Sequence, residues 1–117
     1  MKDCKPKLFV IDDDPDCRYL ATTFLEMAGY EVRSVDCPSK VGKHFFKDSL
    51  AILMDTELGV SFGPDYCQQF KKTYGIPVVG MSSLRSYERD WDNVGADGFI
   101  DKIRLSDIGF LVGELLK

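Results

Sequence analysis

Residues 8–16 read LFVIDDDPD and join an apolar segment directly to a run of acidic residues. A short continuous apolar segment is typical of a strand that is buried on both faces, as in a parallel sheet. Asp14 followed by Pro15 is the pattern of a helix N-cap and the first helical residue. The stretch therefore predicts a buried strand over 8–12 that ends in carboxylates and is followed at once by a helix.

The same strand-then-helix pattern recurs along the rest of the chain. Apolar or alternating segments predict strands over 8–12, 31–35, 50–55, 76–81 and 98–102. Apolar residues at helical spacing predict helices over 15–28, 38–47, 62–74, 84–94 and 108–116, the last of them capped by Ser106. Strict alternation of strands and helices favours a parallel sheet with helices on both faces.

The topology follows from the handedness of the connections and the apolar character of the strands. Right-handed crossovers leave few arrangements, and the two most apolar strands, 8–12 and 50–55, should lie centrally. The common open arrangement of five such strands has the order 2-1-3-4-5. We therefore predict a doubly wound α/β fold of three layers, with a ligand crevice beyond the carboxyl ends of the first and third strands.

Composition and charge limit the classes of function. The 117 residues, 44% of them hydrophobic, suffice for one packed core, so we expect a single domain over 1–117. A net charge of −4 without a concentrated basic segment argues against direct nucleic-acid binding. No apolar run is long enough for a membrane span, and no secretory signal precedes the first strand. Four scattered cysteines and a single histidine make no zinc motif, so reduced thiols and a cytoplasmic location are expected.

Polar side chains stand at the ends of four of the five predicted strands. Asp12 and Asp13 end the first strand, and Asp55 ends the third, which neighbours it at a spacing of about 5 Å. Ser82 follows the fourth strand and Lys102 ends the fifth. Because the carboxyl ends of parallel strands share one edge of the sheet, we expect three carboxylates, a hydroxyl and an ammonium around one crevice.

These groups suit phosphoryl transfer assisted by a hard cation. Clustered carboxylates remain ionised together only when a cation screens them, and an all-oxygen set favours Mg²⁺ where phosphate is involved. A carboxylate beside the metal can attack a phosphoryl group and form an acyl phosphate. The metal and the ammonium of Lys102 would then neutralise charge on the transferring oxygens, and Ser82 would donate to one of them.

Four motifs in order, VIDDDPD, ILMDTELG, PVVGMSS and GADGFIDK, resemble the receiver domain of bacterial response regulators, with its stand-alone CheY-like members. The resemblance extends over 8–117 and includes Gly63, eight residues after Asp55. It implies a CheY-like, flavodoxin-like fold and a phosphoacceptor role in two-component signalling. A sensor histidine kinase or a histidine phosphotransfer protein would be the phosphodonor. An unknown downstream effector protein would read a change in the surface formed by the fourth helix, fifth strand and fifth helix.

The resemblance also assigns a role to individual residues. Asp55 would be the phosphoacceptor, and Lys102 the counter-ion of its phosphate. The switch residues would be the hydroxyl-bearing Ser82 and the aromatic Phe99. The Mg²⁺ ligands would be Asp55, Asp13 directly, Asp12 mostly through water and Glu57 through its backbone carbonyl. The chain would be a phosphoacceptor with possible self-phosphorylation and autodephosphorylation, and not a turnover enzyme.

The chain departs from the family pattern at three places. Ile103 follows the lysine where the family usually has a proline, often in a cis bond, so we expect a trans bond here. Leu58 and Gly59 replace the common Met-Pro after the phosphoacceptor, which gives that loop more backbone freedom. Glu57 adds a carboxylate that could compete for Lys102. These departures keep open the alternative of a degenerate receiver that acts as a phosphorylation-independent protein-interaction module.

Two further alternatives concern chemistry and packing. Asp12-x-Asp14 superficially fits the nucleophile motif of haloacid-dehalogenase phosphatases, but the residues after it do not continue that motif. Trp91 and Tyr87 lie at helical spacing with apolar neighbours, so we expect them in the core rather than on a partner-binding face. For Phe99, a switching role and plain half-buried packing are equally compatible with its position.

Overall fold

The computed structural model describes residues 4–45 and 47–117. Five parallel strands form one sheet in the order β2-β1-β3-β6-β7. Their bounds are β1 (Lys7–Ile11), β2 (Glu31–Val35), β3 (Ser49–Asp55), β6 (Val78–Ser82) and β7 (Gly98–Asp101). Counted within this sheet alone, the order is 2-1-3-4-5, so the predicted topology is confirmed and β1 and β3 are interior neighbours.

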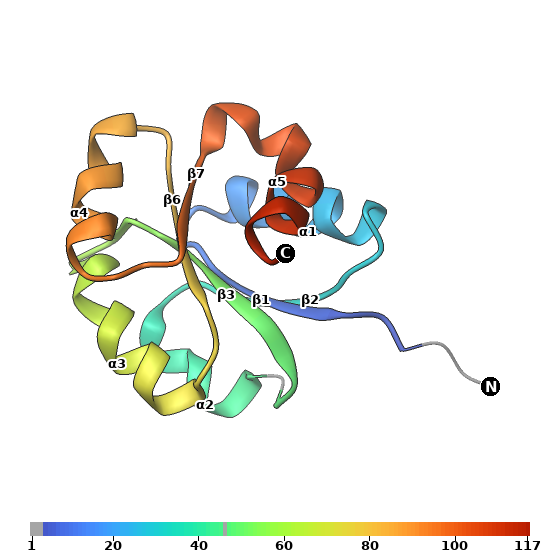
Figure 1. Cartoon of the computed structure of the whole chain (residues 1–117), viewed down its shortest axis with the longest axis horizontal. Coiled ribbons are helices and arrows are strands. Elements are labelled where there is room, and N and C mark those ends of the chain that lie inside the picture. Colours follow the sequence, from blue (N-terminus) through green and yellow to red (C-terminus); the bar gives the residue numbers. More distant parts are fainter. Residues whose placement is uncertain (1–3, 46) are drawn as a thin grey trace.

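Helices cover both faces of the sheet (Figure 1). α1 (Pro15–Met27) and α5 (Ile108–Leu115) pack together on one face. α2 (Val41–His44), α3 (Pro64–Tyr74) and α4 (Glu88–Asn93) lie on the other. Within the described ranges, no helix is long and apolar enough to cross a membrane.

β1 links the two helical layers. Leu8 and Val10 join a hydrophobic cluster with α1 and α5, whereas Phe9 and Ile11 join a second cluster with α3 and α4. All four side chains are fully buried. Because successive residues of a strand point to opposite faces, one apolar run supplies both clusters. The same burial holds the end of the strand, and hence the acidic residues after it, in a fixed position.

The start of α1 is as predicted from the sequence. Asp14 is the N-cap, and its carboxylate accepts a bond from the backbone N–H of Asp16 at 2.9 Å. Pro15 is the first helical residue, where its missing N–H costs nothing. The helix ends before Gly29, which has a φ of +101°. The role of Asp14 is therefore structural.

The structure corrects the predicted helix over 62–74. Phe62 lies in a small antiparallel hairpin of β4 (Glu57–Leu58) and β5 (Ser61–Phe62), and α3 begins two residues later. Gly59 turns this hairpin with a φ of +68°, a left-handed conformation that favours glycine. The regular aromatic spacing therefore runs across an element boundary and did not reveal it.

Two other predicted helices are shorter than expected. The segment 38–47 forms a 3₁₀ turn, η1 (Pro38–Lys40), followed by the four-residue α2; residue 46 lies outside the described residues. A glycine within α2 weakens its helical propensity. The segment 84–94 starts with a second 3₁₀ turn, η2 (Arg85–Tyr87), before α4 begins. Leu84 therefore precedes the helix and is 54% exposed.

The last helix begins at the predicted residue, but its cap differs from the prediction. Asp101 accepts a bond from the backbone N–H of Ile103 at 3.0 Å and so opens a 3₁₀ segment, η3 (Lys102–Asp107). Ser106 lies inside this segment, and α5 begins at Ile108 with Asp107 at the N-cap position. The prediction of Ser106 as a helix cap was therefore wrong, because the earlier cap at Asp101 starts a separate turn.

Trp91 is the largest fully buried side chain and fits against two glycines. Gly80, in β6, has the indole directly over its Cα, so that a Cβ there would overlap the ring. Gly63 lies over the benzo edge of the same indole, where a Cβ would also overlap the carbonyl oxygen of Asp55. Trp91 therefore belongs to the core, as its spacing predicted, and its position depends on the absence of side chains at these two residues.

We expect Gly80→Ala to destabilise the fold by about 1–3 kcal/mol, because the added methyl group must displace the buried Trp91 indole. Gly42→Ala in α2 is the matched control, since a Cβ at Gly42 meets nothing within 4 Å. That substitution is expected to be neutral or slightly stabilising. Urea unfolding measures both changes, and equal effects of the two substitutions would contradict the packing described here.

Candidate functional site

Asp12 is held by its own loop at the end of β1. The residue is fully buried, and its backbone N–H donates to the Val35 carbonyl at 3.1 Å. Its carbonyl accepts a bond of 2.7 Å from the Arg18 guanidinium, and its Oδ1 accepts one of 3.0 Å from the Asp14 N–H. These bonds fix the backbone and one carboxylate oxygen, so Oδ2 is the atom that faces the site.

Asp55 ends β3 beside Asp12. It is 8% exposed, and its Oδ1 accepts a bond of 2.9 Å from the Thr56 N–H. Carboxylate oxygens of Asp12, Asp13 and Asp55 lie within 4.8 Å of one another. Asp13 is exposed and lies at the mouth of the group. The three acids that the sequence placed at two strand ends are therefore brought together.

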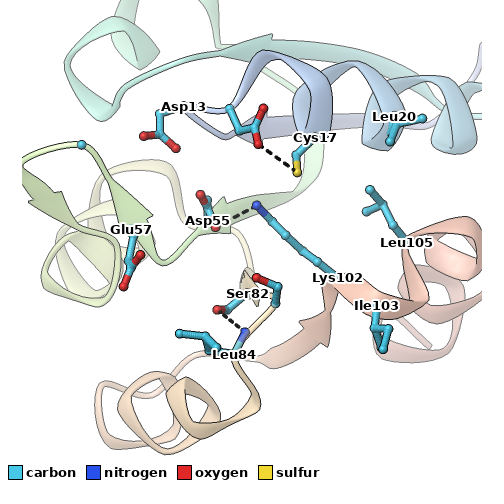
Figure 2. A pocket seen from close by; sticks show the side chains of 13 residues that line it. Asp13, Cys17, Leu20, Asp55, Glu57, Ser82, Leu84, Lys102, Ile103 and Leu105 are labelled. Carbon is cyan, nitrogen blue, oxygen red and sulfur yellow. Dashed lines mark hydrogen bonds and ion pairs between the residues drawn. The ribbon is translucent and has the colours of Figure 1, made fainter.

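Lys102 crosses the sheet edge to reach these acids (Figure 2). Its Nζ lies 2.7 Å from Asp12 Oδ2 and 3.0 Å from Asp55 Oδ1. The Lys102 side chain is 10% exposed, so the ammonium is largely removed from bulk water. All peptide bonds within the described ranges are trans, including the one after Lys102, as expected for Ile103. The missing proline therefore does not prevent the lysine from contacting both carboxylates.

The charges of the site perturb one another. Burial, and then repulsion from Asp12, raise the pKa of Asp55 to about 7, although the Lys102 ammonium and the Thr56 N–H act in the opposite direction. Burial alone would lower the pKa of Lys102, but its hydrogen bonds and attraction to Asp12 and Asp55 outweigh burial and raise it. The single ammonium of Lys102 is thus shared by the carboxylates of Asp12 and Asp55, and it neutralises only one of their two negative charges.

The donor set fits a divalent cation. Three carboxylates and one ammonium, if all are ionised, leave two negative charges at the edge of the sheet. All candidate ligands in the cluster are carboxylate oxygens, which are the preferred donors of hard cations such as Mg²⁺. Asp13 is exposed and forms no ion pair with another described residue, so it is best placed to complete such a site with Asp55 and Asp12.

Ser82 lies on the opposite side of the same cavity. It ends β6 with 5% exposure, and its Oγ accepts a bond of 2.9 Å from the Leu84 N–H. As an acceptor in that bond, the hydroxyl keeps its own proton for donation. The cavity, of about 780 Å³, is lined by Asp13 and Asp55, and Leu20, Leu84 and Ile103 form apolar parts of its lining (Figure 2).

Glu57 and Phe99 occupy less central positions. The Glu57 carboxylate accepts a bond of 2.5 Å from the Tyr87 hydroxyl, which holds it apart from Lys102. Glu57 therefore does not compete for the lysine in this structure. Phe99 is half-buried and packs against the hydrophobic cluster beneath α3 and α4. Tyr87 itself is half-exposed, so its predicted place in the core is only partly correct.

Two residues of the site were not singled out in the sequence. Thr56 is fully buried and bonds Asp55 through its backbone, and Arg18 holds the Asp12 carbonyl. Arg18 is one helical turn after the N-cap Asp14, and this spacing could have indicated that it folds back over the loop. For Thr56 the signal was its place directly after Asp55, since a buried hydroxyl there requires partners.

Comparison with known proteins identifies the family. The model of the response regulator receiver domain matches residues 8–108. The nisin biosynthesis regulatory protein NisR of Lactococcus lactis subsp. lactis is 28% identical over 102 residues, which are 82% of this chain and 43% of NisR. This chain thus spans less than half the length of that relative.

Solved structures have the same fold. Response regulator TrrA of Thermotoga maritima, in complex with Mg²⁺-BeF, superposes with a TM-score of 0.81 at 21% identity over 94% of this chain and 98% of TrrA. Chemotaxis protein CheY4 of Vibrio cholerae gives 0.77 at 19% identity over 96% and 99% of the two chains. The matched residues 8–108 contain the five strands of the sheet, apart from the first residue of β1, together with the strand-end acids, and this chain belongs to the response regulator receiver domain family.

Proposed function

We propose that this receiver domain, residues 1–117, accepts a phosphoryl group on Asp55 from a phosphohistidine of a partner protein. The partner is a sensor histidine kinase or a histidine phosphotransfer protein, and the acceptor works in the cytoplasm of a bacterium. The observation that carries this proposal is the cluster of Asp12, Asp13 and Asp55 with Lys102 bonded to two of them. The complex of TrrA with Mg²⁺-BeF supports it, because that relative binds a metal and a phosphoryl mimic.

The proposed reaction forms one bond and breaks one bond. An Asp55 carboxylate oxygen attacks phosphorus, the P–N bond of the phosphohistidine breaks, and the imidazole leaves with the electron pair and takes up a proton. Lys102 neutralises charge on the transferring oxygens, and Ser82 donates a hydrogen bond to one of them. Asp12, Asp13, Asp55 and the Glu57 carbonyl would hold Mg²⁺, which supplies positive charge to the phosphoryl group when bound.

The output of this reaction is a change of surface and not a released product. The phosphoryl dianion would draw Ser82 inward, and Phe99 would follow into the space beside it. Receiver domains are signalling domains, and a downstream effector protein would read the surface of α4, β7 and α5. The phosphoryl group shifts the equilibrium between the inactive and the active surface only by the difference between its interaction free energies with these two states.

We expect acetyl phosphate with Mg²⁺ to add the mass of one phosphoryl group to the wild-type chain, because a small acyl phosphate can replace the protein donor at an open cavity. Asp55→Asn, which has no carboxylate nucleophile, should remain unmodified under the same conditions. Intact-mass spectrometry with and without Mg²⁺ measures both. An unmodified wild-type chain would instead favour the degenerate receiver, which binds partners without phosphorylation.

Mg²⁺ affinity should depend on Asp13. We expect Asp13→Asn to weaken Mg²⁺ binding by at least about tenfold, since it removes one charged ligand from the open side of the cluster. Asp16→Asn is the matched control, because Asp16 is also exposed in the same segment but lies outside the cluster. Isothermal titration calorimetry measures both affinities. Equal weakening by the two substitutions would indicate a general loss of negative charge and no ligand role for Asp13.

Stability without metal should fall as pH rises towards neutrality. The folded chain keeps a proton on Asp55 up to about pH 7, whereas the unfolded chain loses it near the ordinary value of 3.8. Between these values the native state binds more protons, so the free energy of unfolding contributed by this group falls with rising pH and its loss is complete above pH 7. Asp55→Asn removes this titration and should gain about 1–2 kcal/mol over wild type across the interval, because cavity water moderates the effect.

Urea unfolding at a series of pH values, with a chelator present, tests this expectation. Saturating Mg²⁺ should reduce the difference between wild type and Asp55→Asn, because the metal replaces the proton as the partner of the carboxylate. Parallel stability curves of the two proteins over the whole interval would show that Asp55 titrates normally.

A further inference from the structure

We propose that Thr56 and Glu57, the two residues after the phosphoacceptor, transmit its modification directly to the segment that contains η2 and α4. They do so through Trp91 and Tyr87, which lie one helical turn apart on that segment. This route is separate from the inward movement of Ser82. The inference rests on the proposed function, since it concerns how phosphorylation of Asp55 is read.

The Thr56 hydroxyl connects three elements. It donates to the Met81 carbonyl of β6 at 2.8 Å and accepts a bond of 2.8 Å from the Trp91 Nε1 of α4. The backbone N–H of the same residue bonds Asp55 Oδ1 at 2.9 Å. Thr56 and Trp91 are fully buried, so water does not substitute for these bonds. A displacement of Thr56 therefore acts on α4 without passing through solvent.

The indole of Trp91 is confined in its site. Gly80 lies against one side of the ring and Gly63 against its edge, both at distances that leave no room for a Cβ. The same Gly63 position abuts the carbonyl oxygen of Asp55. Because a close-packed group has few places to move, a shift of the Thr56 partner is passed to the helix backbone rather than absorbed by a rotation of the ring.

Tyr87 makes the second connection. Its hydroxyl donates to Glu57 at 2.5 Å, and its ring packs edge-on against Phe62 of the hairpin at a centroid distance of 5.7 Å. The β4–β5 hairpin thus contacts η2, while Thr56 contacts α4. Two successive residues of the acceptor loop are bonded to two residues of one helical segment, which is the arrangement needed to move that segment as a unit.

Phosphorylation changes Asp55, whose carboxylate accepts the hydrogen bond from the Thr56 N–H. When an oxygen of Asp55 binds phosphorus, the carboxylate becomes the neutral acyl part of an acyl phosphate, and the negative charge lies on the phosphoryl oxygens. The Thr56 N–H, which also donates to the Met81 carbonyl at 3.0 Å, then has a neutral carbonyl oxygen or a phosphoryl oxygen beside it in place of the carboxylate. Since hydrogen bonds to charged groups are the stronger ones, the position of Thr56 is sensitive to this change.

The test compares Thr56→Val with Thr56→Ser. Valine has nearly the shape of threonine and removes only the hydroxyl, whereas serine retains it. Fluorine NMR measures how much beryllofluoride each protein binds with Mg²⁺, and hydrogen exchange measures the response of the backbone amides of α4. Fluorescence of Trp91, the only tryptophan in the chain, reports the indole itself.

We expect the α4 exchange response of Thr56→Val, per bound beryllofluoride, to fall below about half of the wild-type response, and Thr56→Ser to restore it. Tyr87→Phe, which removes only the hydroxyl that contacts Glu57, should lower the response independently and serves if Thr56→Val does not fold. If Thr56→Val only destabilised the fold, Thr56→Ser would not restore the α4 exchange response, and the response would not scale with the amount of bound beryllofluoride.

Two results would overturn the inference, and they are distinguishable. If Thr56→Val and Tyr87→Phe both bind beryllofluoride and give the full α4 response, while Ser82→Ala abolishes it, the signal passes through Ser82 alone. If the wild-type chain binds no beryllofluoride, the proposed function fails, and this inference fails with it.

Discussion

The contact of one ammonium with two buried carboxylates organises the functional edge of this sheet. Lys102 starts beyond β7, an edge strand, and reaches over β6 to the ends of β3 and β1. Without its charge, Asp12 and Asp55 would repel each other at a place where water screens them poorly. The lysine therefore makes the cluster compatible with folding, but it leaves the cluster short of positive charge. Three carboxylates beside one ammonium leave excess negative charge at this edge, which suits a divalent cation.

Strand-end residues could be predicted from the sequence because a parallel β/α topology places every carboxyl end of a strand at one edge. The apolar run before Asp12 and the one before Asp55 were sufficient to bring these acids together, and Ser82 and Lys102 followed from the same rule. The comparison structures have this fold with little sequence identity, which shows that the rule depends on pattern more than on particular residues.

Contacts between elements could not be predicted in the same way. The Trp91 indole fits against Gly80 because the glycine has no side chain, but neither residue alone indicates in the sequence that the two are in contact. The bond of Tyr87 to Glu57 requires a hairpin that begins where aromatic spacing suggested continuous helix. Helical periodicity indicates which side of a segment is apolar. It does not indicate the turn at Gly59 that brings this hairpin back to η2.

The departures from the family pattern are compensated by such local contacts. The lysine precedes Ile103 through a trans bond, and the cap at Asp101 sets the direction in which η3 begins, so that the ammonium still reaches both carboxylates. The Tyr87 hydroxyl bonds the extra carboxylate of Glu57, which therefore does not pair with Lys102. The same bond attaches the loop after Asp55 to η2. Glu57, a departure from the family pattern, is thus the residue that connects the β4–β5 hairpin to η2.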